Sequence, residues 1–172
     1  MNLFQLFKAS LMEPRKQAAV RIMSIGKILR YVFLLILLMT LVSFIELAAG
    51  LGETGNDMEG LLEFVEDIKW LLYPFAFIFL FVSTTLYQFV KISLFALVGL
   101  AFIHLKKRKG EYRHLWRTTA LAVTVPTLLS FAFSFFNVAI WVTWALGLLT
   151  IVYLHFATNY YPKQPPAKKK PA

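Results

Sequence analysis

The sequence predicts an all-α polytopic membrane protein, a four-helix transmembrane bundle with interfacial amphipathic helices at its N-terminus. Two observations predict this fold class. Hydrophobic residues make up 59% of the 172 residues and charged residues only 16%, against about 45–50% and about 25% in ordinary soluble domains. The charges are also sorted along the chain, so that long apolar stretches separate basic segments from an acidic one.

Four apolar stretches are long enough to cross a bilayer, which takes about 20 helical residues. They occupy residues 31–50, 75–105, 118–136 and 138–156, and together they form a predicted transmembrane domain over residues 31–156. The acidic segment 51–69 is predicted to be an outer loop that contains a short amphipathic helix. Residues 157–172 are rich in proline and lysine and are predicted to form a disordered basic tail.

The distribution of charge predicts the orientation. Sixteen of the 18 Lys and Arg residues fall in residues 1–30, 106–117 and 157–172, whereas six of the nine Asp and Glu residues fall in residues 51–69. Basic segments stay in the cytoplasm, so both termini are predicted to be cytoplasmic, in a multi-pass protein of the cell membrane. The net charge of +9 is then explained by anionic lipid headgroups, and no nucleic-acid partner is predicted.

The apolar stretch Trp70–Leu105 decides the number of spans. The segments before residue 31 and after residue 105 are both basic, so an odd number of crossings must follow the first span. Three crossings do not fit in 36 residues, so the stretch is predicted to cross once. Pro74 is expected to separate an outer turn from the long helix, and Ser83–Thr85 offers a second bend.

The N-terminal arm, residues 1–30, has two interpretations. Apolar residues recur at helical spacing on either side of Pro14. Two short amphipathic helices lying on the membrane surface would explain this pattern. A cytoplasmic arm that docks on the bundle would explain it equally well.

Two charged residues lie within the apolar stretches, Glu46 and Lys91. Each costs about 2.5–3.5 kcal/mol at the centre of a bilayer. Glu46 lies four residues from the outer end of its span, and Lys91 lies five residues from the outer end of its own if the membrane core of the second span is Leu86–Leu105. On that basis the two are predicted to pair, or to form the two poles of a small polar cavity with Gln88. The alternative is that each side chain extends separately to an interface.

The last two spans carry packing signals. Pro126 removes a backbone hydrogen bond to Ala122 and should kink the third span, for shape or for gating. Thr124, Thr127 and Ser130 are candidates to satisfy the freed groups. On the fourth span, small residues at a spacing of four permit close helix contact within the chain or with a partner. These residues are Ala139, Thr143 and Gly147.

No catalytic, metal or cofactor motif is found in the sequence. Cysteine is absent, and His104, His114 and His155 do not have the spacing of a ligand motif. No enzymatic activity and no cofactor are therefore predicted. The predicted partners are anionic lipid headgroups and a membrane protein. The headgroup-binding residues are predicted to be Lys106, Lys107, Arg108, Lys109, Lys168, Lys169 and Lys170.

Two stretches together resemble a bacterial membrane family of unknown function, some of whose members are described as maltodextrin-utilisation proteins. The first stretch comprises Asn2–Phe4, Phe7, Ser10, Pro14, Arg21, Ile25–Lys27 and Tyr31. The second comprises Lys107–Arg117 and Ala122–Leu129, and it is also similar to the broader Yip-like clan, in which a basic glycine loop precedes a proline-containing helix. The family usually has a larger extracytoplasmic insert where residues 51–69 stand, and it has no established catalytic residues.

Two functions are compatible with these features. The first is a non-enzymatic membrane accessory or scaffold protein which, as the resemblance implies, would act beside carbohydrate (maltodextrin) uptake. The second is a small transporter or channel subunit whose polar path is lined by Glu46, Gln88 and Lys91.

Overall fold

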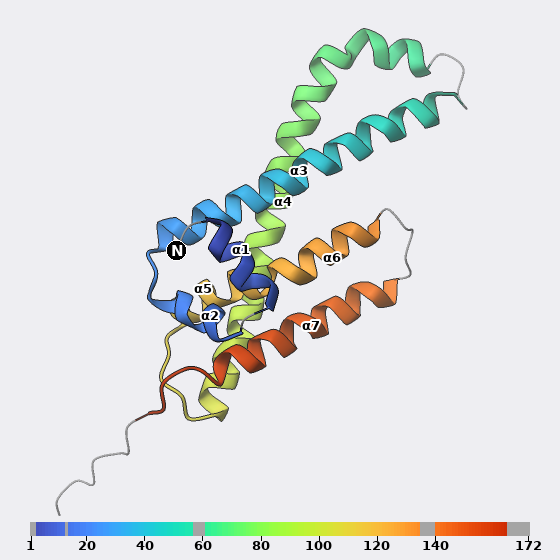
Figure 1. Cartoon of the computed structure of the whole chain (residues 1–172). Helices are drawn as coiled ribbons and strands as arrows, with labels where there is room; N and C mark the ends of the chain where they lie inside the picture. Colours follow the sequence, from blue (N-terminus) through green and yellow to red (C-terminus); the bar gives the residue numbers. More distant parts are fainter. Residues whose placement is uncertain (1–2, 13, 57–60, 135–139, 165–172) are drawn as a thin grey trace, which may run out of the picture. The chain divides into compact units, whose positions relative to one another are not determined.

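The computed structural model describes residues 3–12, 14–56, 61–134 and 140–164, and within these ranges the chain is all-helical, as predicted. One isolated extended bridge, between Arg108 and Lys163, is present in this part of the chain. The elements are α1 (Leu3–Met12), α2 (Pro14–Ala19), the 3-10 helix η1 (Val20–Ile22), α3 (Ile25–Asn56), α4 (Leu61–Leu105), α5 (Tyr112–Ala122), α6 (Thr124–Ser134) and α7 (Ile140–Thr158) (Figure 1). The chain divides into two compact units: Met1–Tyr31 with Lys91–Ala172, and Val32–Val90.

Two helices are apolar and long enough to cross a membrane. One covers Ile25–Gly50 and the other covers Asp67–Leu105, and the mean hydropathy of the most apolar 18 residues is 2.6 in the first and 1.9 in the second. The predicted third span is divided between α5 and α6, and the apolar part of α7, Trp144–Thr158, is shorter. Helix length and composition thus support two crossing helices, and the four-span bundle stays a prediction.

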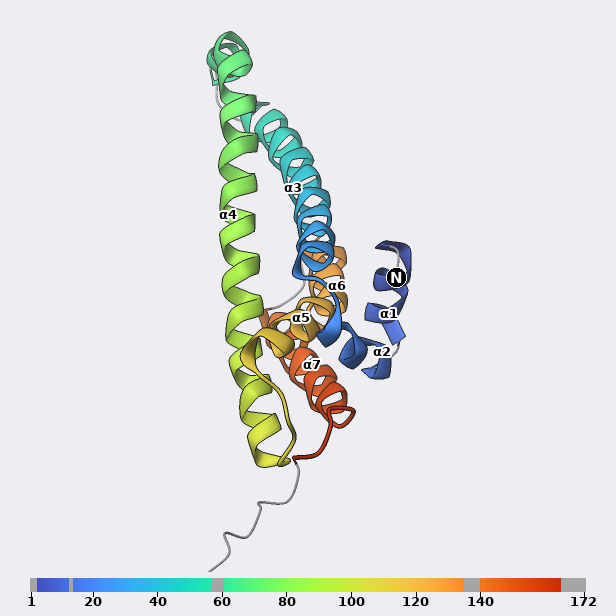
Figure 2. The same cartoon turned by 90° about the vertical axis from the view of Figure 1, so that its left-hand side faces the viewer.

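The second unit, Val32–Val90, consists of parts of α3 and α4, which pack through aromatic rings. The Phe44 ring meets Tyr73 and Phe77 edge-on, with centroids 5.9 and 5.6 Å apart, and Phe33 meets Phe89 at 5.8 Å. Phe33 on α3 pairs with Phe89 on α4, whereas the later Phe44 pairs with the earlier Tyr73 and Phe77. The two helices therefore run antiparallel here (Figure 2).

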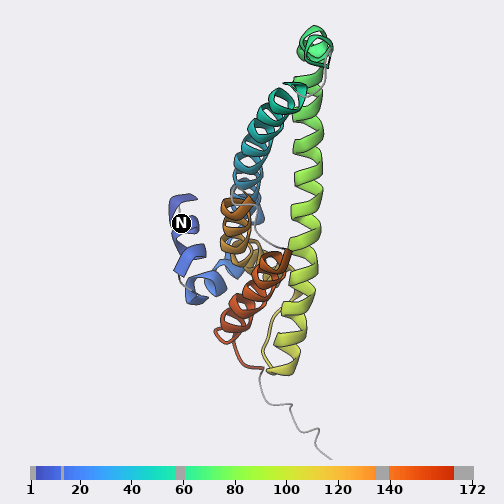
Figure 3. The same ribbon diagram turned by 90° about the vertical axis from the view of Figure 1, so that its right-hand side faces the viewer.

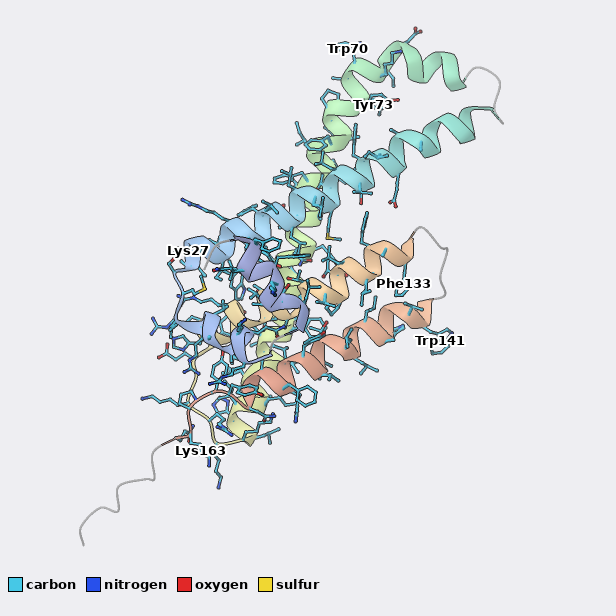
Figure 4. The ribbon with its side chains drawn as sticks, viewed as in Figure 1. Lys27, Trp70, Tyr73, Phe133, Trp141 and Lys163 are labelled. Carbon is cyan, nitrogen blue, oxygen red and sulfur yellow. The ribbon has the colours of Figure 1, made fainter. Side chains whose placement is uncertain are left out.

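The ends of α3 and α4 extend into the segment predicted to be an acidic loop. α3 continues beyond Gly50 to Asn56, and α4 begins at Leu61 and passes through Pro74 without interruption. The helix bends instead of ending, and Figure 4 shows Trp70 and Tyr73 at this bend. α4 is also continuous at Ser83–Thr85, where a second bend was predicted. There the Thr85 hydroxyl donates to the Phe81 carbonyl one turn earlier, at 2.7 Å.

The first unit has a compact core that joins its N-terminal, central and C-terminal segments. Among its described residues, Ala18, Ala96, Ile103, Leu115 and Tyr161 form a buried cluster, with Leu100 and Trp116 packed against it. α5 packs against η1, α2 and α7. α6 packs against α7, and the two helices lie side by side in Figure 3. Residues more than 140 positions apart therefore share one core.

The N-terminal arm is docked on this core. α1 packs against α5 and α6, and it buries Leu6, Ala9 and Ser10. The Tyr31 hydroxyl contacts both the Ser10 and Thr124 hydroxyls, at 3.3 and 3.0 Å. The arm therefore packs on the core, as one of its two interpretations expects, and α1 also exposes an apolar side, where Phe4 is 77% exposed. The position of the arm at the membrane surface stays a prediction.

Candidate functional site

The most elaborate polar structure in the described residues is a clasp, formed by residues 106–110 after α4 and residues 159–164 after α7. Lys109 N–H donates to the Pro162 carbonyl at 2.7 Å, and Gln164 N–H donates to the Lys107 carbonyl at 3.1 Å. Lys107 has a φ of 49°, so it supplies the left-handed turn that folds the two segments together.

Lys106 caps the C-terminus of α7. Its ammonium donates to the His155 carbonyl at 2.7 Å, to Thr158 Oγ1 at 3.0 Å and to Asn159 Oδ1 at 2.7 Å. The final carbonyl groups of a helix lack partners within the helix, and a cation there also complements the helix dipole. Burial and the neighbouring Arg108 lower the pKa of Lys106.

Of the predicted headgroup-binding residues, the four that the structure describes divide into two groups. Lys106 caps α7, and Arg108 Nη1 donates to the Tyr161 carbonyl at 2.8 Å, so both are used inside the protein. Lys107 and Lys109 are exposed. Lys168, Lys169 and Lys170 lie outside the described residues.

Tyr161 is the centre of the clasp. It is 1% exposed, and its hydroxyl lies 2.7 Å from Thr118 Oγ1 and donates to the His114 carbonyl at 3.2 Å. Burial raises the pKa of Tyr161, although the hydrogen bond to Thr118 and the charge of Arg21 oppose this rise. Gly110 permits the close packing, because a Cβ there would lie 2.7 Å from Ile103 Cδ1 and 3.0 Å from the Tyr161 ring.

Arg21 connects the N-terminal arm to the clasp. Its guanidinium lies 5.1 Å from the centroid of the Tyr161 ring, and Nη1 donates to the Tyr160 carbonyl at 3.4 Å. Arg117 Nη1 in turn donates to the Arg21 carbonyl at 2.9 Å. We call the cationic residues gathered in this unit the basic platform: Arg15, Arg21, Lys106, Lys107, Arg108, Lys109, Arg113, Arg117 and Lys163.

Two hollows open on the basic platform, and both are lined by Arg21. One, of about 240 Å³, is lined by Arg21, Ile22, Lys109, Gly110, Glu111, His114 and Pro162. The other, of about 340 Å³, is lined by Arg15, Ala18, Ala19, Arg21 and Tyr160. In the first, Glu111 and His114 form a capping box at the start of α5, and Arg113 Nε lies 2.6 Å from the Glu111 carboxylate.

The charge state of His114 follows from its surroundings. Burial lowers the pKa of His114; Glu111 raises it, and the positive charges of Arg113, Arg117 and Arg21 lower it further. The ring Nδ1 accepts from the Glu111 N–H at 3.3 Å. In the neutral ring the proton is therefore on Nε2, which is a hydrogen-bond donor.

The predicted intramembrane polar residues fall in different units. Glu46 is exposed and Gln88 is buried in the second unit, and the Gln88 amide nitrogen has no hydrogen-bond partner among the described residues. Lys91 belongs to the first unit, where its ammonium donates to Thr127 Oγ1 at 3.2 Å. The Glu46–Lys91 pair and the polar cavity stay predictions.

Pro126 follows a break in the helix. α5 ends at Ala122 and α6 begins at Thr124, with Val123 between them. The Thr124 hydroxyl donates to the Ala120 carbonyl at 3.2 Å, whereas the Thr127 hydroxyl accepts from Lys91. The carbonyl that Thr124 bonds is therefore that of Ala120, whereas the carbonyl freed by Pro126 belongs to Ala122.

The helix-packing positions predicted on the fourth span show no close contact in the described residues. Ala139 and the side chain of Thr143 lie outside the described residues. A Cβ on Gly147 would meet no atom within 4 Å, so no close helix contact forms at Gly147 within the described chain. In the same part of the chain no group of three His, Cys, Asp or Glu side chains is arranged to hold a metal ion.

Sequence reasoning missed Arg21, Arg117 and Tyr161 as a group. They lie on η1, on α5 and after α7, and no motif links such distant positions. The one local signal was the apolar pair Tyr160–Tyr161 within residues 157–172, which were predicted to be a disordered tail. In the structure α7 instead continues to Thr158, and residues 159–164 take part in the clasp.

These observations define a class of protein: an all-helical chain with two helices apolar enough to cross a membrane and a platform of basic side chains. The chain belongs to the DUF1189 family of proteins of unknown function, whose profile matches residues 52–158. The predicted resemblance to a family of unknown function is confirmed at this level, while the maltodextrin description and the Yip-like relation stay predictions. No curated protein and no solved structure matches the chain.

Proposed function

We propose that this chain is a four-span integral protein of the cell membrane that acts as a non-enzymatic accessory or scaffold. Its two termini and its basic platform lie on the cytoplasmic side. There the platform meets anionic lipid headgroups and a membrane protein partner. Action beside carbohydrate (maltodextrin) uptake is the part of this proposal that rests on the family resemblance alone.

The apolar surface of the long helices supports a location in the membrane. Only 22% of the most apolar stretch of α3 and 28% of that of α4 is buried. Leu34, Leu38 and Ile45 on α3 are 50–63% exposed. A soluble protein rarely leaves so large an apolar surface in water, whereas the hydrocarbon core of a bilayer solvates it.

The observation that carries the proposal is that three distant basic segments meet in one unit. Arg21 contacts Tyr160, Arg117 bonds Arg21, and Lys109 bonds Pro162. Segments in contact must lie on one side of a bilayer, so the chain crosses an even number of times between each of them. α3 and α4 account for one pair of crossings, and α6 and α7 are the candidates for the second. Basic segments favour the cytoplasm, which gives the orientation.

The polar contacts of the platform support an accessory role over an enzymatic one. Lys106 caps a helix, Arg108 bonds a backbone carbonyl, and Glu111 caps α5 and pairs with Arg113. These contacts stabilise a shape, and the exposed lysines beside them present charge to a surface.

Cysteine labelling tests the topology directly, because the chain contains no cysteine. Single-cysteine variants at Lys8, Asn56, Lys107, Asn137 and Lys163 are treated with a membrane-impermeant maleimide in intact and permeabilised cells. Positions 56 and 137 should react in intact cells, and positions 8, 107 and 163 only after permeabilisation. The cysteine-free parent is the control. Labelling of 56 and 107 from one side would contradict the proposal.

A transport assay separates the accessory role from the alternative. Purified protein in liposomes should show no solute flux that depends on Glu46 or Lys91, and a stoichiometric membrane protein should co-purify from native membranes. Flux that disappears in Glu46→Gln and Lys91→Met would instead establish the transporter.

A further inference from the structure

The hollow of about 240 Å³ on the basic platform has the composition of an anion site. Its side-chain donors come from three separate parts of the first unit: η1 supplies Arg21, the loop after α4 supplies Lys109, and α5 supplies His114. Pro162 of the clasp completes the lining. In Figure 4 many side chains that end in nitrogen, drawn in blue, lie around Lys163, which follows Pro162 in the chain.

The cations of this hollow are not neutralised within the described chain. No carboxylate pairs with Arg21 or with Lys109 among the described residues, and Lys109 is exposed at the rim. The one acid in the lining, Glu111, is compensated by Arg113 at 2.6 Å and accepts from the backbone N–H of His114. The Nε2–H of neutral His114 adds a donor without adding charge.

Arg21 is held in place before any ligand arrives. Its guanidinium stacks on the Tyr161 ring and bonds the Tyr160 carbonyl, while Arg117 bonds its backbone. A side chain ordered in advance loses less conformational entropy when it binds a ligand. Arginine also presents a rigid fork of donors that matches the oxygen atoms of a phosphate.

We propose that this hollow binds a phosphate group, with Arg21 and Lys109 as charged ligands and His114 as a neutral donor. Donors that come from three elements suit a tetrahedral oxyanion better than a planar carboxylate. The phosphate belongs either to an anionic phospholipid or to a soluble phosphate ester. The second hollow, which shares Arg21 and adds Arg15, continues the cationic surface for the rest of the ligand.

This inference rests on the proposed function only for access to cytoplasmic ligands, because the site lies wholly within the first unit. The experiment therefore uses the full chain purified in a non-ionic detergent, where membrane topology does not matter. The probes are inorganic phosphate, dihexanoyl-phosphatidylglycerol and, as a zwitterionic control, dihexanoyl-phosphatidylcholine. The NMR signals of the His114 ring report binding, since an anion beside the ring raises its pKa.

A saturable shift is expected with phosphate or with the anionic lipid, and only a weaker one with phosphatidylcholine. Lys109→Gln should weaken binding about fivefold, as expected for the loss of one charge contact. Lys107→Gln is the matched control: it removes the same charge from the same loop outside the hollow, and should weaken binding less than twofold. Both side chains are exposed, so both variants should keep the parent's unfolding temperature.

The probes also distinguish the source of the phosphate. Saturation with inorganic phosphate indicates a soluble ester, and saturation with phosphatidylglycerol alone indicates a lipid headgroup. Equal weakening by Lys109→Gln and Lys107→Gln would overturn the proposal in favour of diffuse attraction, and so would the absence of saturation with every probe. Neither result would alter the topology measured by cysteine labelling.

Discussion

The two units of this protein are stabilised by different kinds of contact. In the second unit, α3 and α4 meet through aromatic rings such as Phe44 and Tyr73, and much of their apolar surface stays exposed. In the first unit, side chains of Tyr161, Lys106 and Arg21 form directional bonds between distant segments. The comparison shows that one unit relies on apolar contacts and leaves apolar faces exposed, as the proposed membrane location would explain, whereas the other relies on directional polar contacts.

The largest expected effect is at the centre of the clasp. Tyr161→Ala should reduce the free energy of unfolding by about 3–5 kcal/mol, because it leaves a cavity in the core. Tyr161→Phe keeps the ring and should cost about 1 kcal/mol for the lost hydroxyl contacts. Denaturant unfolding of the purified protein in detergent measures both. A cost below 1 kcal/mol for Tyr161→Ala would break the comparison, because the clasp would then not stabilise the first unit.

A smaller effect is expected at Gly110. Gly110→Ala places a Cβ against Ile103 and the Tyr161 ring, and such overpacking typically costs about 1–3 kcal/mol. Gly26→Ala is the matched control, because a Cβ on Gly26 meets no atom within 4 Å and helix propensity favours alanine there. The two unfolding midpoints in detergent should therefore move in opposite directions. Equal midpoints would show that Gly110 is not tightly packed.

In the second unit the expected cost is lower still. Phe44→Leu keeps most of the apolar volume and loses two edge-on ring contacts, which should cost about 1 kcal/mol. Leu41→Ala, on the exposed side of the same helix, should change stability by less than about 0.5 kcal/mol. If Phe44→Leu cost as much as Tyr161→Ala in the same unfolding assay, the contrast between the units would be wrong.

The smallest expected effect is a change in titration. The His114 ring should titrate below 6.5 in the anion-free protein, and Glu111→Gln should lower its pKa further because it removes the opposing charge. Since the folded-state pKa is below the unfolded one, the unfolded chain takes up the proton first, and His114 reduces stability as the pH falls below about 6.5. NMR titration measures the pKa; a value above 6.5 without a bound anion would contradict the electrostatics of the hollow.

Much of the helical architecture could be predicted because hydrophobicity acts locally. The runs around residues 31–50 and 75–105 are long and apolar whatever surrounds them, and the structure contains α3 and α4 there. The continuation of α4 through Pro74 was not predicted, since proline removes one hydrogen bond but a long helix can bend around it. The break at Val123 before Pro126 shows the other outcome, in a helix of half that length.

The candidate site was predicted only in part. Its charge was visible in Lys106–Lys109, but these four residues look equivalent in a sequence, and the structure gives them different roles. Lys106 and Arg108 bond carbonyl groups of residues 155 and 161, which lie about 50 positions away. Their partners are backbone atoms, which carry no residue-type signal in the sequence.

By itself, the sequence determined the helical class, the positions of the long apolar helices and the segregation of basic from acidic segments. These properties depend on composition and spacing within short windows. Only the tertiary structure decided that Arg21, Lys109, His114 and Tyr161 share one site, and that the N-terminal arm docks on the core. Such contacts join residues up to about 140 positions apart, and they form because the folded core brings three chain segments together, a constraint that no local pattern records.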